Sequence, residues 1–321
     1  MISKEEIVRD LRRRIFQIQP DVHVSHNGKS NWSLTFSAGK KSNAQFLKSL
    51  FNIDIENWDE KFNEATSGIG QESQRILTLH SSALLALLTF VNISRDNPLL
   101  LLGEKYIKSW FEVKNVIIEG RNPSSVDVLL QSESGNLLFI ESKFTEYLEA
   151  SSPNIVEAYK PIYDSLLPLI DGMPLQMFFP KKFTEDGKEI IGFGLKPKSE
   201  RRDFQNLYLT GIKQSISHLI GISKGPSADD NSQWSDNIEG KTLRYGTILY
   251  RLKSSAFGNY KNFYHQTIGN ITSDKLAECL NGHNAPFVKQ IEVLPNLLTY
   301  QEVFGKSGFK LPERVKYFYH L

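Results

Sequence analysis

The sequence predicts an α/β fold in which helices flank a mixed central sheet, and three observations carry this prediction. Two strand-like runs, 126–131 and 137–143, lie on either side of a short polar loop. A helical pattern at 206–222 precedes a further strand-like run at 243–252, and this order is typical of a crossover that returns the chain to a mixed sheet. Apolar residues also recur at helical spacing upstream, over 71–91.

Residues 1–70 are predicted to form a leading region that packs on the core. The spacing of apolar residues indicates an amphipathic helix at 1–16, a strand at 32–36 and a second amphipathic helix at 44–51. Ser and Gly residues at 67–70 then indicate a loop into the core.

The core is predicted to span residues 71–252, followed by a C-terminal extension at 253–321. Besides the elements above, the core contains a strand at 112–118 and a strand-like run at 176–179. The extension contains a short helix near 273–280 and ends in a stretch rich in Tyr and Phe.

The two central strands are predicted to form a hairpin with a fixed register. The loop Glu133-Ser134-Gly135 suits a three-residue connection with glycine in the left-handed position. Asp127 then lies directly opposite Glu141. The reverse face carries apolar residues that a slip of one position would turn outward, namely Val128, Leu130, Leu138 and Ile140.

The charged residues of this hairpin indicate a chemistry. Residues two apart in a strand share a face, so Glu141 and Lys143 project together while Ser142 points away. With Asp127 opposite, two carboxylates and an ammonium converge, and paired carboxylates suit Mg²⁺, which completes its shell with water and substrate phosphate. Lys143 would orient or help to deprotonate a metal-bound water, as metal-assisted hydrolysis of a phosphodiester requires. The alternative interpretation is a solvated Glu and Lys pair on a strand face.

At these residues the chain resembles a known family. Asp127 followed by Phe139-Ile140-Glu141-Ser142-Lys143-Phe144-Thr145-Glu146 resembles the Asp…Glu-x-Lys core of the PD-(D/E)XK, or restriction-endonuclease-like, nuclease superfamily. It is similar in particular to a bacterial branch whose strand reads Ile-Glu-x-Lys-Tyr-Thr-Glu, from which it differs only by Phe144 in place of Tyr. Segments 79–84 and 213–219 resemble two helices of these proteins.

The resemblance implies a restriction-endonuclease-like mixed sheet and a nuclease that cuts DNA with Mg²⁺ or Mn²⁺, an endonuclease being favoured over an exonuclease. Asp127 and Glu141 would hold the metal, and the carbonyl of Ser142 would add a ligand. Lys143 would act on the water. Gln214 is given a role only by its position in the family pattern, where its side chain would bind the attacking water or a phosphate oxygen.

Two departures from the family pattern stand out. The Pro-Asp pair of the superfamily is Val126-Asp127 here. Many members carry an additional acidic residue upstream, for which Glu72 and Glu119 are candidates, although each also reads as an ordinary surface carboxylate.

The composition limits the kinds of partner that the protein can bind. The chain has 321 residues, 40% of them hydrophobic, which supports an ordinary core of one large domain or two. With 38 basic and 36 acidic residues the net charge is +2, so contact with nucleic acid must come from local clusters. The candidate clusters, each of which also reads as a solvated helix end or loop, are Arg12-Arg13-Arg14, Lys40-Lys41, Lys181-Lys182 and Arg201-Arg202.

The remaining features favour a cytoplasmic protein without a membrane span. The one cysteine, Cys279, excludes an intramolecular disulfide framework and a multi-cysteine zinc site, which fits a reducing compartment. No targeting signal is evident, and the longest apolar stretch, 83–91, is too short to cross a bilayer. His80 lies on an apolar helical stripe, where a hydrogen-bonded core histidine is the more ordinary reading.

Two other classes of function stay open beside the nuclease. One is a module that binds nucleic acid or assembles with a partner and keeps the nuclease fold without cutting. The other is a structural α/β protein with a Glu and Lys pair on its surface. A homodimer is also left open.

Overall fold

The computed structural model describes residues 3–26, 32–35, 42–67, 76–117, 123–148, 178–185, 188–195, 209–225, 234, 240–281, 291–306 and 308–321. The first half of the chain contains helices α1 (Lys4–Ile18), α2 (Asn43–Phe51), α3 (Trp58–Thr66) and α5 (Ser82–Phe90), and strands β1 (His23–His26), β2 (Trp32–Thr35), β3 (Leu99–Leu101), β4 (Glu104–Asn115), β5 (Ser124–Ser132) and β6 (Leu137–Lys143). The second half contains strands β7 (Phe178–Glu185), β8 (Lys188–Leu195), β9 (Leu243–Leu249), β10 (Ile291–Val293) and β11 (Leu298–Thr299), and helices α7 (Leu209–Lys224), α8 (Ser255–Gln266), α9 (Ser273–Asn281), α10 (Tyr300–Lys306) and α11 (Glu313–Tyr319).

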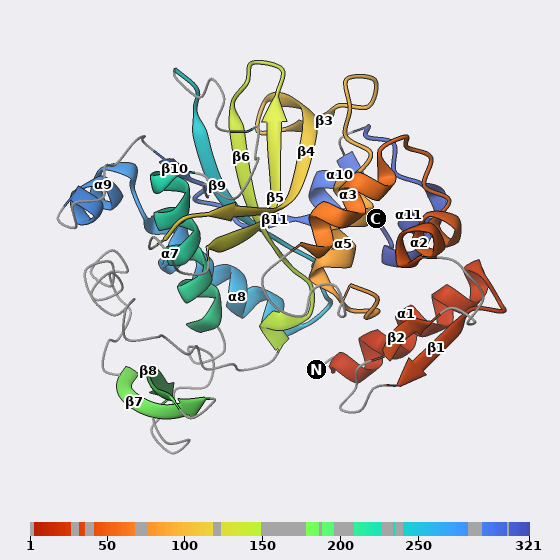
Figure 1. The fold of residues 1–321 in the computed structure, drawn as a ribbon, viewed down its shortest axis with the longest axis horizontal. Coiled ribbons are helices and arrows are strands. Elements are labelled where there is room, and N and C mark those ends of the chain that lie inside the picture. The colour runs from red at the N-terminus through yellow and green to blue at the C-terminus, as the bar shows by residue number, and fades with distance from the viewer. Residues whose placement is uncertain are drawn as a thin grey trace.

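A mixed sheet forms the centre of the protein, as the sequence predicts. Its strand order is β10-β9-β6-β5-β4-β3, with β11 also paired to β9 (Figure 1). Strands β3 to β6 are joined antiparallel, whereas β9 runs parallel to β6, β10 and β11. The crossover expected between the central hairpin and the strand at 243 is thereby confirmed, because α7 lies between β6 and β9 in the chain.

The central hairpin has the predicted register. Val128 pairs with Ile140 and Gln131 with Leu137, and Gly135 in the connecting loop has a φ of 85°, in the left-handed region. Val128 and Ile140 on one face are fully buried, and so are Leu129 and Phe139 on the other, so both faces of the hairpin are covered.

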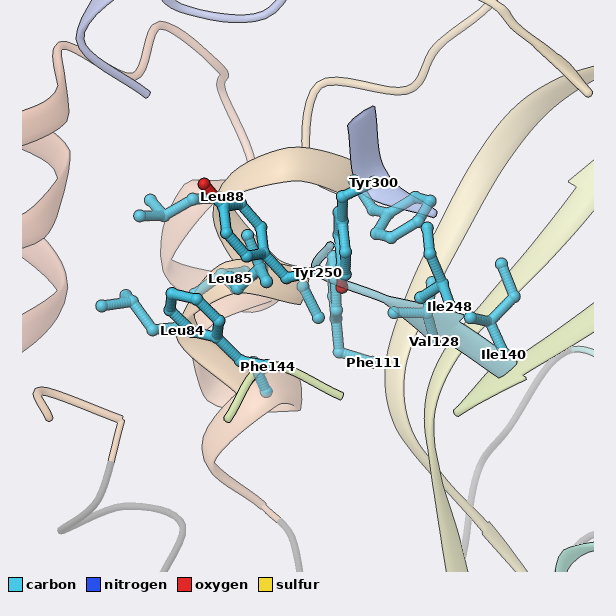
Figure 2. Packing of buried hydrophobic residues seen from close by; sticks show 14 of the residues in the cluster. Leu84, Leu85, Leu88, Phe111, Val128, Ile140, Phe144, Ile248, Tyr250 and Tyr300 are labelled. Atoms are coloured by element: carbon cyan, nitrogen blue, oxygen red, sulfur yellow. The ribbon is translucent and has the colours of Figure 1, made fainter. Parts of the chain in front are cut away.

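Helices cover both faces of this sheet. Helix α5 packs on β5 and β6, and its leucines Leu84, Leu85 and Leu88 belong to the same buried cluster as Val128 and Ile140 (Figure 2). Helix α7 contacts β4 and β5, on the opposite side in Figure 1. It comes close because Gly221 faces Asn115 of β4, where an added Cβ would lie 2.7 Å from the Asn115 Cβ. One face of the hairpin is therefore sealed by α5 and the other is approached by α7.

The predicted helix at 71–91 is wrong over residues 76–81, and residues 71–75 lie outside the described ranges. The segment bonds to β2 instead: the N–H of Leu34 donates to the Leu77 carbonyl at 2.8 Å, and that of Leu79 to the Trp32 carbonyl at 2.9 Å. Helix α5 then begins at Ser82, because the Ser81 side chain accepts from the Leu84 N–H and caps the helix.

The predicted strand at 112–118 is wrong in its start. Strand β4 begins at Glu104, after a tight turn at Leu102 and Gly103, whose φ values of 54° and 77° are both left-handed. The strand ends at Asn115. The next residue bonds to the residue that follows α7, because the Val116 N–H donates to the Gly225 carbonyl at 3.3 Å.

Helix α3 covers the edge of β4 that the short strand β3 leaves open. Lys61 Nζ donates to the Ser109 carbonyl at 2.8 Å, and Glu64 Oε2 accepts from the Phe111 N–H at 3.2 Å. Lys61 and Glu64 also bond each other. Two side chains thus occupy main-chain groups that an additional strand would otherwise bond.

An ionic cluster ties together the strands at the end of the sheet where β6 begins. Arg244 of β9 donates to Glu104 of β4 and, at 2.8 Å, to Glu292 of β10. Asn136 Nδ2 donates to Glu104 at 3.0 Å. The cluster joins three strands that are far apart in sequence.

The trailing part of the chain contributes to the same sheet. Strands β10 and β11 both pair with β9, and α11 packs on α1 of the leading region. The division of the chain at 1–70, 71–252 and 253–321 stays a prediction. Among the described helices, none has both the length and the apolar character needed to cross a bilayer.

Candidate active site

The structure brings Glu141, Lys143 and Gln214 into direct contact. Lys143 Nζ donates to Glu141 Oε1 at 2.5 Å and to Gln214 Oε1 at 2.7 Å. Glu141 and Lys143 lie two residues apart near the end of β6, and Gln214 comes from α7. The sequence analysis expected Gln214 to bind water or phosphate, whereas here its amide oxygen holds the lysine.

Ser142 points to the opposite face, as the strand alternation requires. Its Oγ shares a hydrogen bond of 2.7 Å with the Tyr300 hydroxyl and lies 3.3 Å from the Ser82 carbonyl. Ser82 opens α5 and Tyr300 opens α10, so the strand is held from behind while its charged side chains face α7.

Asp127 lies just beyond the last paired residues of the hairpin. The ladder between β5 and β6 ends at Val128 and Ile140, and Asp127 Oδ2 then accepts a hydrogen bond from the Ser142 N–H at 2.6 Å. The N–H and C=O of one strand residue point to the same neighbour, so the Ser142 carbonyl also faces β5. The neighbouring Lys143 carbonyl faces β9, where it accepts from the Tyr250 N–H.

Glu141 and Lys143 are buried, so they do not form a solvated pair on the surface of a strand. Glu141 is 3% exposed and Lys143 is 7% exposed. Burial raises the pKa of Glu141, but Lys143 and His218 outweigh it and hold the pKa at about 2. Glu141 is therefore ionised at neutral pH despite its burial.

Asp127 and Lys143 have pKa values shifted upward. Burial raises the pKa of Asp127 well above its ordinary range, and the charges of Glu141 and Glu112 raise it further. For Lys143, burial lowers the pKa, but the carboxylates around it, Glu141 first, outweigh burial and raise it above the ordinary value. Lys143 is thus held as a cation, and Asp127 lies where a further positive charge would be stabilising.

His218 is a member of the site that the sequence analysis did not identify. Its Nε2 lies 2.8 Å from Glu141 Oε2, and its Nδ1 lies 2.6 Å from Ser124 Oγ. The signal was available, because His218 follows Gln214 by four residues and positions four apart share one helix face.

Glu112 is a second residue that the sequence analysis missed. The β4 and β5 pairs Phe111 with Val128 and Val113 with Val126 flank it, which places it across from Asp127. It is 8% exposed and has a φ of 47°, a left-handed conformation that is costly for a side chain of this kind.

The two acidic candidates named from the sequence, Glu72 and Glu119, lie outside the described residues.

The donor set fits a cation that needs few protein ligands. In the described part of the chain, no group of three or more His, Cys, Asp or Glu side chains is arranged to hold a metal ion. Asp127, Glu141 and the Ser142 carbonyl offer hard oxygen atoms, and Mg²⁺ is usually bound by one or two carboxylates with water filling the remaining positions. Burial first, and the charges of Glu141 and Glu112 next, raise the pKa of Asp127, so a cation bound beside it would favour its ionised form.

Residues of the basic cluster Arg12-Arg13-Arg14 make contacts within the protein. The Arg12 guanidinium lies over the rings of Phe16 and Trp32, at 5.6 and 4.2 Å from their centroids. Arg14 donates to the Phe318 carbonyl at 2.9 Å and to Asp10. Lys40-Lys41 and Arg201-Arg202 fall outside the described ranges, as do the side chains of Lys181-Lys182 on β7.

A model of a known protein family matches part of the chain. The family model described as restriction endonuclease associating with ARP matches residues 29–204, more than half of the chain. This range contains Asp127, Glu141 and Lys143 but ends before α7 and β9. No curated protein and no solved structure matched. The helix-flanked mixed sheet is compatible with a restriction-endonuclease-like fold, and the chain belongs to the family of restriction endonucleases associating with ARP.

Proposed function

We propose that this protein is a metal-dependent nuclease of the PD-(D/E)XK type that hydrolyses phosphodiester bonds of DNA, as an endonuclease rather than an exonuclease. Restriction, defence against foreign DNA and repair are the settings in which such an activity would serve. The single cysteine suits a cytoplasmic setting.

The observation that carries the proposal is the burial of Glu141 and Lys143 beside Asp127. Removing a carboxylate and an ammonium from water costs several kcal/mol per ion, and replacing such a pair by apolar residues is often neutral or stabilising. Buried charges with displaced pKa values in one place are typical of functional sites. Membership in a restriction endonuclease family supports the same reading.

Each residue has a role in this proposal. Asp127 and Glu141 would hold Mg²⁺ or Mn²⁺, with the Ser142 carbonyl as a further oxygen ligand. The metal would supply a Lewis acid for the phosphoryl oxygen and an activated water. Lys143, held as a cation, would stabilise negative charge that develops on the phosphate. Gln214 would orient the Lys143 ammonium.

The second candidate is a module that binds nucleic acid or a partner protein without cutting. The family description names an association with ARP, and a partner that completes or directs the site would fit it. The ion pair favours this candidate in one respect: Lys143 already bonds both Glu141 and Gln214, so the site is satisfied internally without substrate.

Cleavage assays separate the two candidates. The purified chain is incubated with supercoiled plasmid, linear duplex, single-stranded DNA and RNA, with Mg²⁺, with Mn²⁺ and with chelator. Metal-dependent nicking or linearisation of plasmid supports the endonuclease, whereas loss of linear substrate alone supports an exonuclease. Glu141→Ala is the matched inactive variant.

Binding is measured beside cleavage at several salt concentrations. Each neutralised phosphate of duplex DNA contributes about 0.9 to the slope of log affinity against log salt. Salt-dependent binding without cleavage would favour the module. Absence of both at low salt counts against the nuclease and against a module that binds nucleic acid. Sedimentation of the free and DNA-bound chain tests whether the protein forms the homodimer that the sequence leaves open.

A further inference from the structure

Helix α7 holds both members of the buried ion pair through side chains one turn apart. Gln214 Oε1 accepts from Lys143 Nζ at 2.7 Å, and His218 Nε2 lies 2.8 Å from Glu141 Oε2. Since positions four apart lie on one face of a helix, a single face of α7 contacts the ammonium and the carboxylate together.

The imidazole of His218 is fixed at its second nitrogen as well. Ser124 Oγ lies 2.6 Å from His218 Nδ1, and both residues are buried, at 7% and 4% exposed. An ionised carboxylate only accepts, so Nε2 carries the hydrogen that Glu141 receives, while Nδ1 faces a hydroxyl that can donate or accept. Ser124, at the start of β5, His218 and Glu141 thus form one buried hydrogen-bonded line.

We propose that His218 is a positioning residue that fixes the Glu141 carboxylate for a divalent cation, and that Ser124 fixes the imidazole. The inference rests on the proposed function, because it takes Glu141 as a metal ligand. Lys143 bonds Oε1 and His218 bonds Oε2, but each carboxylate oxygen has two lone pairs. Both oxygens therefore keep one acceptor direction for a cation while their orientation is set.

A purely structural histidine would have no effect on metal affinity once the protein is folded. A positioning residue would, because side chains that orient metal ligands typically change metal affinity about 10- to 100-fold when they are removed. The two roles therefore differ in a quantity that can be measured without cleavage.

The test is calorimetric titration of the full chain with Mn²⁺, with unfolding by denaturant to show that each variant is folded. His218→Ala should bind Mn²⁺ about 10- to 100-fold more weakly than the parent. His218→Gln, whose amide can donate to Glu141, should recover most of that loss. Ser124→Ala should show a smaller loss than His218→Ala.

Ser223→Ala is the matched control for Ser124→Ala. Ser223 is a buried serine near the end of α7 whose hydroxyl donates to the Ile220 carbonyl, so this variant should bind Mn²⁺ as the parent does. If His218→Ala does not fold, Ser124→Ala decides the question in its place.

The outcomes distinguish this inference from the proposed function. A folded His218→Ala with parental affinity, beside a Glu141→Ala that no longer binds Mn²⁺, overturns the role of His218 and leaves the proposed function in place. If His218→Ala fails to fold, a folded Ser124→Ala with parental Mn²⁺ affinity likewise overturns the role of His218 and leaves the proposed function in place. A parent chain that binds no Mn²⁺ overturns both proposals.

Discussion

The Asp127 carboxylate accepts a hydrogen bond from the Ser142 N–H at 2.6 Å where β5 and β6 cease to pair. The side chain takes the place that a main-chain carbonyl of a continuing strand would have. One residue therefore ends the ladder and presents a carboxylate beside the last residues of β6.

Asp127→Asn and Asp127→Ala should separate these two functions. Asparagine keeps an oxygen for the Ser142 N–H, so Asp127→Asn should fold with near-parental stability but bind Mn²⁺ weakly and not cleave. In Asp127→Ala the Ser142 N–H has no such acceptor. This variant should therefore lose metal binding and also about 1–3 kcal/mol of its free energy of unfolding. Urea unfolding and metal titration measure the two effects. Equal stability of both variants would contradict the structural role of the hydrogen bond.

Lys143→Ala should separate metal binding from catalysis. Both carboxylates remain, so Mg²⁺ and DNA should still bind, while cleavage falls by about 10²-fold or more through loss of the cation. Without metal the variant should be less stable by about 3–5 kcal/mol, because Glu141 stays buried without its ammonium partner. Plasmid cleavage and denaturant unfolding with and without Mg²⁺ measure these changes.

Lys61→Ala is the matched control for Lys143→Ala. Lys61 is also a largely buried lysine paired with a glutamate, but it lies on α3 at the edge of β4. The Lys61→Ala variant should be less stable than the parent, but the folded variant should cleave at the parental rate. If Lys143→Ala cuts as fast as the parent, the proposed role of the ammonium is wrong.

Glu104→Gln should change the pH dependence of stability. Burial would raise the pKa of Glu104, but hydrogen bonds from Ser132, Arg244 and Asn136 outweigh it and lower the pKa below its ordinary 4.5. A lowered folded pKa stabilises the protein above the unfolded pKa, and the contribution is lost as pH falls through the folded pKa. The stability difference between parent and variant should therefore be constant above about pH 4.5 and shrink below it.

Urea unfolding at a series of pH values from 7 to 3 measures this difference, with the exposed Glu278→Gln as control. A difference that grows toward acid pH would reverse the sign of the argument.

Two glycine substitutions test the approach of α7 to the sheet. Gly221→Ala places a Cβ 2.7 Å from that of Asn115, so α7 must shift, with a loss of about 1–3 kcal/mol. Gly258→Ala in α8 meets no atom within 4 Å and should raise stability by about 0.5–1 kcal/mol, because alanine is the better helix former. Thermal unfolding of both variants should show shifts of opposite sign.

The hairpin that carries the site could be predicted from the sequence because its information is local. The loop length, the glycine at 135 and the alternation of apolar residues together fix one register, which the pairing of Val128 with Ile140 confirms. The shared face of Glu141 and Lys143 follows from the same alternation, and their contact confirms it.

The rest depended on contacts between distant segments. Glu112 lies near Asp127 only because of the register between β4 and β5, and no local signal sets that register. Leu77 fits the helical stripe expected over 71–91, but its carbonyl and the Leu79 N–H bond to β2 instead, so tertiary contacts override the periodicity. His218 reaches Glu141 through the packing of α7, which the four-residue spacing from Gln214 suggested without establishing.

The hydrogen bond between Ser142 and Tyr300 has a practical consequence for dissecting this protein. The family match ends at residue 204, yet the strand bearing Glu141 and Lys143 has β9 as a neighbour and Tyr300 at its back. A fragment trimmed to the matched range would expose the edge of β6 and lose both supports. A shortened chain should therefore retain β9 and α10, because these elements complete the sheet beside β6 and support Ser142 from behind, although both lie beyond the range of sequence similarity.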